Sequence, residues 1–146
     1  MKKMNKKGFT LIELLAIIVI LAIIAVITVP LILGIIDEAK EKSAISSVVG
    51  YGKAVELAYS HYQLGTDTTL ANASGDLANG AYIKLQVGSA TTDTINLRVD
   101  FSGDKVVCST TDGANVVANG KITLSGCKVG NDNVTTYTYN NGVASK

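Results

Sequence analysis

A run of 23 residues without a charged side chain, from Leu14 to Ile36, constrains this chain more than any other feature. Four lysines lie among the seven residues that open the sequence, so the run has a basic flank on one side. Because about 20 helical residues cross a ~30 Å hydrocarbon core, a run of this length predicts a membrane-spanning helix. The positive-inside rule then predicts a cytoplasmic N-terminus and export of everything after residue 37.

A secretory signal peptide is the obvious alternative, and the sequence fits it poorly. Signal peptides have a shorter apolar core that is followed by small residues at the cleavage site. Here the core is longer, and Asp37-Glu38-Ala39-Lys40 follows it. A small residue, Gly8, instead lies between the lysines and the apolar run. Cleavage after Gly8 would remove a basic leader, residues 1–8, and keep the membrane helix.

Glu13 is an acid at the edge of the apolar segment, which makes it a functional candidate. Cleavage after Gly8 would create a basic α-amine at Phe9, one helical turn from Glu13. A charge pair within one chain would build no polymer, whereas a pair between chains would bring each subunit into register with the last. The alternative is that Glu13 lies solvated among the lipid headgroups, favoured by the dipole of the first helical turn.

The residues around this junction resemble the leader and mature N-terminus of type IV pilins and pseudopilins. The resemblance is specific from about residue 6 to residue 30, and it is densest in Lys6-Lys7-Gly8-Phe9-Thr10-Leu11-Ile12-Glu13-Leu14-Leu15. Ala22 departs from the pattern, since many relatives carry a glycine in the middle of the apolar run.

The resemblance implies a processing route and a role for each residue of the junction. A prepilin peptidase would cut between Gly8 and Phe9, and Phe9 would be N-methylated. Glu13 would pair with the Phe9 amine of a neighbouring subunit during assembly. The implied partners are other copies of the chain, the peptidase, an assembly platform with its ATPase, and membrane lipid before assembly.

The helix is expected to extend beyond the membrane, over residues 9–63. Pro30 predicts a kink near residues 26–30, because it removes a backbone hydrogen bond and crowds the preceding turn. Residues 9–36 would span the membrane, and 37–63 would form an amphipathic half with a stripe at spacings of three and four: Ile45, Val48, Gly52, Val55, Tyr59 and Tyr62. Gly50 and Gly52 each weaken a helix by about 1 kcal/mol unless a sheet packs closely on them.

Residues 64–146 are expected to form a β-rich head. A loop with a short helical turn at residues 76–79 leads into strand candidates at 82–87, 95–101, 105–108, 121–124 and 134–139, with turn signals that include Asp112-Gly113 and Asn119-Gly120. The predicted class is therefore α+β: a long N-terminal helix packed against a small antiparallel sheet of three to five strands. The resemblance implies the same layout, the pilin fold.

Cys108 and Cys127 are the only cysteines, and both lie in the part predicted to be exported. Outside the cytoplasm a disulfide between them is the leading interpretation. It would close a loop of about 20 residues, for which chain entropy suggests a stabilisation of roughly 3 kcal/mol. A zinc site is disfavoured, because the single histidine, His61, is distant in sequence.

Catalysis, cofactors and nucleic acid find little support. Loss of the leader leaves nine basic against twelve acidic residues, so the mature chain has no strongly basic character for direct nucleic-acid binding. His61 has no nucleophile or orienting acid in a recognisable motif, and no phosphate-loop spacing occurs around Gly50. The Asn/Asp clusters at 112–115 and 131–133 leave calcium open, although such clusters are mostly turns and the EF-hand spacing is absent.

These patterns predict a structural protein rather than an enzyme. The favoured function is a type IV pilus subunit, a single-pass membrane protein before assembly and part of an extracellular filament afterwards. The alternative within the same family is a pseudopilin of a type II secretion or competence (DNA uptake) system. A remote alternative is a signal-anchored, monomeric surface binding module.

Overall fold

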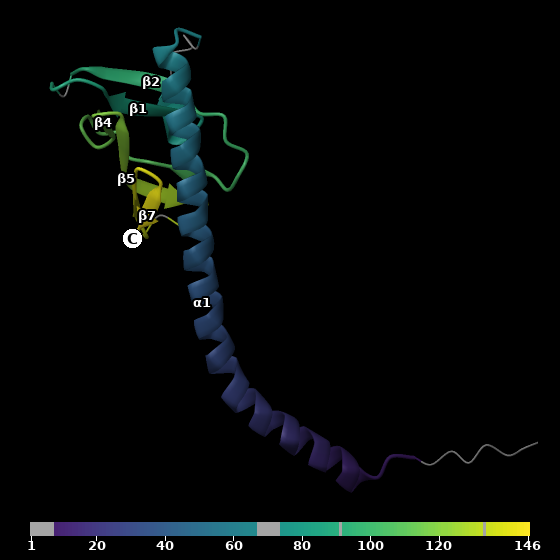
Figure 1. The fold of residues 1–146 in the computed structure, drawn as a ribbon. Helices are drawn as coiled ribbons and strands as arrows, with labels where there is room; N and C mark the ends of the chain where they lie inside the picture. The colour runs from purple at the N-terminus through teal and green to yellow at the C-terminus, as the bar shows by residue number, and fades with distance from the viewer. Residues whose placement is uncertain (1–7, 67–73, 91, 133) are drawn as a thin grey trace, which may run out of the picture. The chain divides into compact units, whose positions relative to one another are not determined.

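The computed structural model describes residues 8–66, 74–90, 92–132 and 134–146 (Figure 1). A long helix, α1 (Leu11–Gln63), and a short one, α2 (Ser74–Ala78), precede the strands. The strands are β1 (Tyr82–Gln86), β2 (Thr94–Arg98), β3 (Val106–Val107), β4 (Val116–Ala118), β5 (Lys121–Val129), β6 (Tyr137–Asn140) and β7 (Val143–Ser145). The chain divides into two compact units, Met1–Lys40 and Glu41–Lys146, and the boundary falls inside α1.

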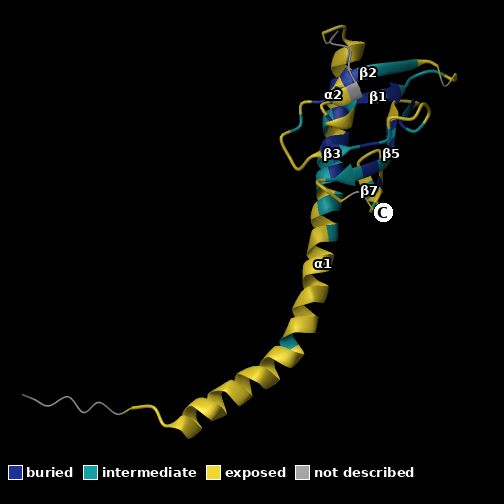
Figure 2. Cartoon of the chain, turned by 180° about the vertical axis from the view of Figure 1, so that it is seen from behind, coloured by how far each residue is buried: buried dark blue, intermediate teal, exposed yellow. Residues whose placement is uncertain are grey.

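In the first unit, the predicted membrane segment is helical from Leu11 onward. The helix continues through Pro30 as regular α-helix (Figure 1), so the missing N–H of that proline does not end it. The kink expected at residues 26–30 stays a prediction. Nearly all residues of this unit's helix are exposed (Figure 2), which is the reverse of what an apolar sequence does in the core of a globular domain.

In the second unit, the strands form one sheet in the order β2-β1-β4-β5-β6-β7, and β3 pairs with β5 off this path. The α+β class is confirmed. The expectation of a wholly antiparallel sheet of three to five strands is wrong in two respects. The described sheet has seven strands, and β1 pairs parallel with β4 through Gln86 and Val116. A parallel pair needs a long connection between its two strands. Here the connection from β1 to β4 includes β2 and β3, which is long enough for β4 to lie beside β1 in the same direction.

The sheet packs on the C-terminal part of α1 and forms the core. From the predicted helix stripe, Val48, Gly52 and Val55 are buried, whereas Ile45 and Tyr59 are half-buried. Tyr62 remains 39% exposed, because this end of the stripe lies beyond the part of the helix that the core covers. The sheet side of the core consists mainly of aliphatic and tyrosine side chains: Ile83, Leu85, Leu97, Val117, Ile122, Leu124, Tyr137 and Tyr139.

Tyr51 was not predicted as a core residue, yet it is 1% exposed. Its hydroxyl donates a hydrogen bond to the Gly80 carbonyl at 3.1 Å, and its ring meets Phe101 edge-on with centroids 5.8 Å apart. Burial raises the pKa of Tyr51, so the side chain stays neutral in its site. A tyrosine can take a core position here because its hydroxyl has a partner.

The two glycines of the amphipathic half are explained by close packing. A Cβ at Gly52 would overlap the ring of Tyr139, and one at Gly50 would lie 3.1 Å from the ring of Phe101. Glycine lowers the helix propensity at these two positions. Its presence is explained by the aromatic rings, which lie too close to the helix backbone for a larger residue.

Two Asn-Gly steps form the hairpin turns of the sheet. Asn119 and Gly120, between β4 and β5, have φ of 52° and 74°. Asn141 and Gly142, between β6 and β7, have φ of 46° and 96°. Two successive positive φ values match the turn that the right-handed twist of paired strands favours, and Asn-Gly is the dipeptide that reaches it most easily.

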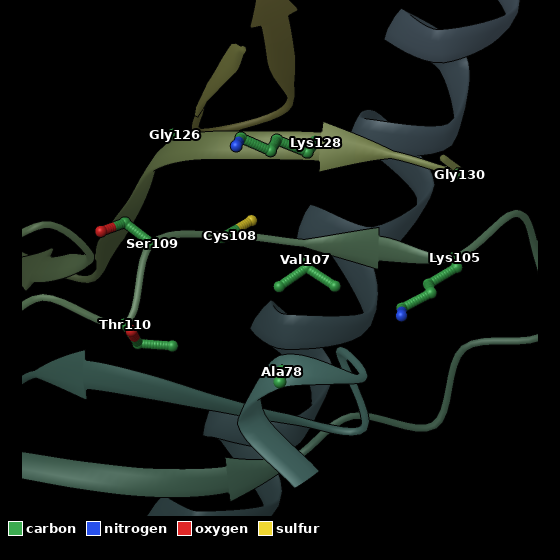
Figure 3. Close-up of a pocket in the computed structure, with 9 residues that line it drawn as sticks. All are labelled: Ala78, Lys105, Val107, Cys108, Ser109, Thr110, Gly126, Lys128 and Gly130. Atoms are coloured by element: carbon green, nitrogen blue, oxygen red, sulfur yellow. The ribbon is translucent and has the colours of Figure 1, made fainter. Parts of the chain in front are cut away.

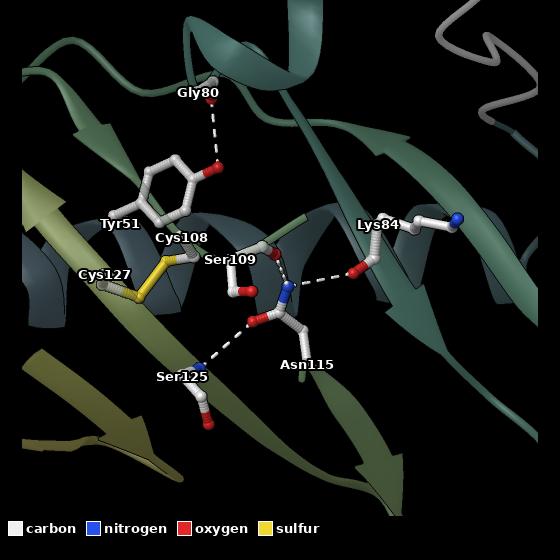
Figure 4. The surroundings of a disulfide bond; sticks show 8 residues. All are labelled: Tyr51, Gly80, Lys84, Cys108, Ser109, Asn115, Ser125 and Cys127. Carbon is white, nitrogen blue, oxygen red and sulfur yellow. Dashed lines mark hydrogen bonds between the residues drawn. A yellow bond between two sulfur atoms is a disulfide. The ribbon is translucent and has the colours of Figure 1, made fainter. Parts of the chain in front are cut away.

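Cys108 and Cys127 form a disulfide in the structure, with Cα atoms 3.7 Å apart (Figure 4). Val107 pairs with Lys128 in the β3–β5 ladder, so the next residue along β3 faces Cys127 directly. The bond therefore fastens the short β3 ribbon to β5, as the sequence predicts.

Beside the disulfide, the buried side chain of Asn115 joins three segments (Figure 4). Its Nδ2 donates to the carbonyls of Lys84 at 3.1 Å and Ser109 at 2.6 Å. Its Oδ1 accepts from the backbone N–H of Ser125 at 3.1 Å. A buried amide is stable only with such partners, so Asn115 fixes β1, β5 and the chain after β3 relative to one another.

Candidate functional site

The junction predicted to be cleaved lies before the first turn of α1. Gly8, Phe9 and Thr10 are exposed and have no regular secondary structure, and the Phe9 side chain is 77% exposed. Gly8 does not adopt a positive φ, and a Cβ built on it would meet no atom within 4 Å. The fold of the described residues therefore does not require glycine at this position.

Thr10 and Glu13 form a reciprocal cap at the start of α1. The backbone N–H and the hydroxyl of Thr10 both donate to Oε2 of Glu13 at 2.8 Å. The N–H of Glu13 points back to the hydroxyl oxygen of Thr10 at 3.3 Å. This is the capping box, in which threonine at the N-cap and glutamate three residues later satisfy backbone donors that lack helical partners.

The cap gives Glu13 a role within its own chain that the sequence analysis missed, although the Thr-x-x-Glu spacing was there to indicate it. The cap also fixes the geometry of the carboxylate. Both Thr10 donors use the same oxygen, Oε2. Across the described residues no hydrogen bond to the other oxygen, Oε1, is found. A capped Glu13 therefore presents a held, exposed carboxylate with an oxygen available to an external cation.

The apolar part of α1 has no covering within its own chain. Every leucine, isoleucine and valine from Leu11 to Ile36 is between 42% and 84% exposed. The helix is long and apolar enough to cross a membrane. Its hydroxyl at Thr28 donates to the Ile24 carbonyl at 2.9 Å, so this polar group is satisfied inside the helix, as a lipid environment requires.

Three of the residues considered for calcium, Asp112, Asn115 and Asp132, make other interactions. Asp112 forms an ion pair with Lys84, and Asn115 is the buried amide of the head. Asp132 accepts hydrogen bonds from the N–H groups of Val134 at 2.8 Å and Thr135 at 3.1 Å, which lowers the pKa of its carboxyl group. Asn133 lies outside the described residues. Over the part of the chain that is described, no three His, Cys, Asp or Glu residues gather in a way that could hold a metal ion.

His61 lies exposed in the last turn of α1, beside Arg98 and Asp100. Its neighbours are thus two charged side chains that pair with each other at 3.2 Å. Among the described residues that line a hollow together with His61, none is a serine, threonine, cysteine or lysine.

Comparison with known proteins decides the nature of the N-terminal segment. A family described as the prokaryotic N-terminal methylation motif matches residues 3–29. The chain carries the type IV pilin and pseudopilin signature. No curated protein and no solved structure is detectably similar to it.

The pilin-type signature covers the junction and most of the exposed apolar helix, and it ends just before Pro30. Proteins with this signature are structural subunits rather than enzymes. The signature implies processing by prepilin peptidase and assembly into polymers, and with the apolar helix it fits a membrane-anchored precursor. The head lies outside the match, so its pilin-like layout rests on the structure: a long helix packed against a mixed sheet.

Proposed function

We propose that this protein is the structural subunit of a type IV pilus filament. Prepilin peptidase cuts between Gly8 and Phe9, and the new N-terminus at Phe9 is methylated. The subunit is held in the membrane before assembly. It then polymerises through α1 into a filament with the β-rich heads on the outer surface. The methylation motif at residues 3–29 supports this sequence of events.

The observation that carries the proposal is the exposure of the apolar helix from Leu11 to Ile36. A helix that is apolar on all sides must be covered by lipid or by other helices. Lipid covers it before assembly, and the same segments of neighbouring copies cover it in the filament. The apolar surface of this helix thus anchors the subunit in the membrane first and contacts neighbouring subunits in the filament afterwards.

Glu13 supplies the selective contact in this assembly. Its Oε2 is engaged by Thr10 of its own chain, and its Oε1 receives the methylated Phe9 amine of the next subunit. The amine is basic, so the contact is a charge-assisted hydrogen bond in apolar surroundings, which is stronger than one between neutral groups. An incoming subunit that is out of register leaves both charges unpaired.

The orientation follows from the lysines of the leader, which keep the N-terminus in the cytoplasm. The leader is then cut on that side, and the head lies outside the membrane, where its disulfide is stable. An assembly platform driven by a cytoplasmic ATPase extracts the subunit into an extracellular filament.

A pseudopilin of a secretion or competence system is the second candidate, because the same motif marks that class. It differs in the length and place of the polymer. Electron microscopy of sheared surface material separates the two: long filaments containing this chain support the pilus, and their absence while the chain is cleaved favours the pseudopilus.

Mass spectrometry of the mature N-terminus tests the processing step. We expect a chain that begins at methylated Phe9. The Gly8→Val variant serves as the control. A Cβ at this position meets no atom within 4 Å, so the head should fold normally. This variant should keep its leader. A wild-type chain that retains Met1, or one that begins beyond residue 36, would overturn the proposal.

A further inference from the structure

The two-stranded ribbon of β3 and β5 has different side chains on its two faces. Val106 and Cys108 point into the core, since side chains alternate along a strand and both are nearly fully buried. The opposite, outward face carries Lys105 and Val107 along one strand and Lys128 on the other, where Lys128 pairs with Val107. Figure 3 shows the three side chains along this outward face.

A hollow of about 440 Å³ lies over this face (Figure 3). Glycine creates the space, because Gly126 and Gly130 lie two residues to either side of Lys128 and have no side chains of their own. Both have positive φ, 63° and 62°, so larger residues are disfavoured there. The hollow is lined by Ala78, Lys105, Val107, Cys108, Ser109, Thr110, Gly126, Lys128 and Gly130.

The charge in this hollow is of one sign. The N–H of Gly130 donates to the Lys105 carbonyl at 2.7 Å, which makes Lys105 and Lys128 diagonal neighbours across the ladder. Diagonal neighbours are roughly 7–8 Å apart, within reach of long side chains. No acid is among the lining residues, and none of the ion pairs found among the described residues involves Lys105 or Lys128. The nearby Asp104 instead accepts a hydrogen bond from Ser47 of α1 at 3.1 Å.

We propose that this hollow binds a phosphate group, either free or within a phosphodiester chain. Two like charges on neighbouring positions repel each other, and an anion between them removes that repulsion. Ser109 and Thr110 also line the hollow, at the end away from Lys105 (Figure 3). Ser109 accepts from the N–H of Thr111 at 3.2 Å, which leaves its own proton to donate.

A phosphate suits this donor set better than a carboxylate does. Its oxygens can accept from more than one ammonium group, and lysine binds phosphate as a point charge. The disulfide at Cys108 and Cys127 holds the backbone of the ribbon beneath the hollow, so this surface is formed before the ligand arrives. The site is a local basic feature on a mature chain in which acids outnumber bases.

Titration of the full-length protein in detergent tests the site. Backbone amide signals of Gly126 and Gly130 are followed by NMR while inorganic phosphate, or an abasic deoxyribose-phosphate oligomer, is added. We expect saturable shifts with at least one of the two probes. The combined Lys105→Gln and Lys128→Gln variant should lose affinity by at least about tenfold, because two charge-assisted contacts are lost.

Lys121→Gln is the matched control, since Lys121 lies on the same strand, is exposed and does not line the hollow. Its affinity should equal that of the wild type. Val107→Glu is a second variant that places an acid between the two lysines, and it should also abolish the shifts while thermal unfolding stays cooperative.

Each remaining outcome has a defined meaning. Saturation by inorganic phosphate alone identifies a site for the free ion, and tighter binding of the oligomer identifies a phosphodiester site. Failure of both probes would overturn the proposal. Equal weakening by Lys121→Gln, or full binding by the double lysine variant, would do the same.

Discussion

The two units of this chain use apolar side chains in opposite ways. From Leu11 to Ile36 every large aliphatic side chain is at least 42% exposed, whereas Val48, Leu85 and Leu124 in the second unit are 0% exposed. The second unit buries its apolar surface by folding on itself. The first unit has the more apolar sequence and buries almost none, so its stability must come from lipid or from other chains.

The polar groups follow the same division. In the head, Asn115 is 1% exposed and all its hydrogen bonds go to the backbone of its own unit. In the first unit, Glu13 uses one carboxylate oxygen for Thr10 and keeps the other exposed. Asn115 is thus satisfied within its own unit, while Glu13 keeps an oxygen that the described residues of its chain do not use. Changes in the two units should accordingly affect different properties.

The largest expected effect belongs to Glu13→Ala. It should leave cleavage and head stability intact but abolish filaments, because the Phe9 amine of the next subunit loses its partner. Filaments are scored by electron microscopy of sheared material, and processing by mass spectrometry. Glu13→Gln keeps an oxygen for Thr10 without the charge, and it should fail in the same way.

Thr10→Val is the control that separates assembly from capping. It removes the hydroxyl that pairs with Glu13 but keeps the carboxylate, so filaments should still form. If Thr10→Val abolished filaments as completely as Glu13→Ala, the role of Glu13 would be to cap its own helix. Normal filaments from Glu13→Ala would remove charge pairing from the mechanism.

The sequence predicts the apolar helix and the N-terminal motif of the first unit, because each of these signals is local. The apolar run, Gly8 and the spacing from Phe9 to Glu13 can all be recognised without knowing any long-range contact. The capping box of Thr10 and Glu13 is equally local, although it was not predicted from the sequence. Its Thr-x-x-Glu pattern is a known helix-start signal.

The head is predicted less well, because its pairings connect distant segments. Alternation and turn signals locate most strands, and the Asn141-Gly142 step could have indicated β7 in the same way. The parallel contact between Gln86 and Val116 leaves no periodic trace in the sequence. The bridging role of Asn115 is equally invisible, since it depends on three carbonyl and amide groups brought together only by folding.

The next largest effect should come from the disulfide of the head. Replacing Cys108 and Cys127 together with alanine is expected to lower the free energy of unfolding by about 3 kcal/mol, because the bond constrains a loop of roughly 20 residues in the unfolded chain. Alanine is used because a buried serine hydroxyl would need a partner. Urea denaturation in detergent measures the loss, and reduced wild type is the matched control. A double variant as stable as the wild type would contradict the prediction.

The smallest effect compares two glycines of the same helix, Gly52 in the head and Gly34 in the apolar segment. Alanine favours a helix over glycine by up to about 1 kcal/mol, so propensity alone predicts a gain at both positions. At Gly52 the new Cβ overlaps the ring of Tyr139, whereas at Gly34 it meets nothing within 4 Å. Overpacking of a core costs typically about 1–3 kcal/mol, which outweighs the gain.

Gly52→Ala should therefore destabilise the head by about 1–2 kcal/mol net, while Gly34→Ala should leave head unfolding unchanged. Thermal unfolding of the full chain in detergent, followed by near-UV circular dichroism of the tyrosines, measures both. In a Tyr139→Leu background the ring is gone, so the added cost of Gly52→Ala should shrink, and a double-mutant cycle reports that coupling directly. Equal shifts for the two glycines, or a cost that persists without the ring, would show that packing against Tyr139 is not what distinguishes Gly52 in the head from Gly34 in the exposed apolar helix.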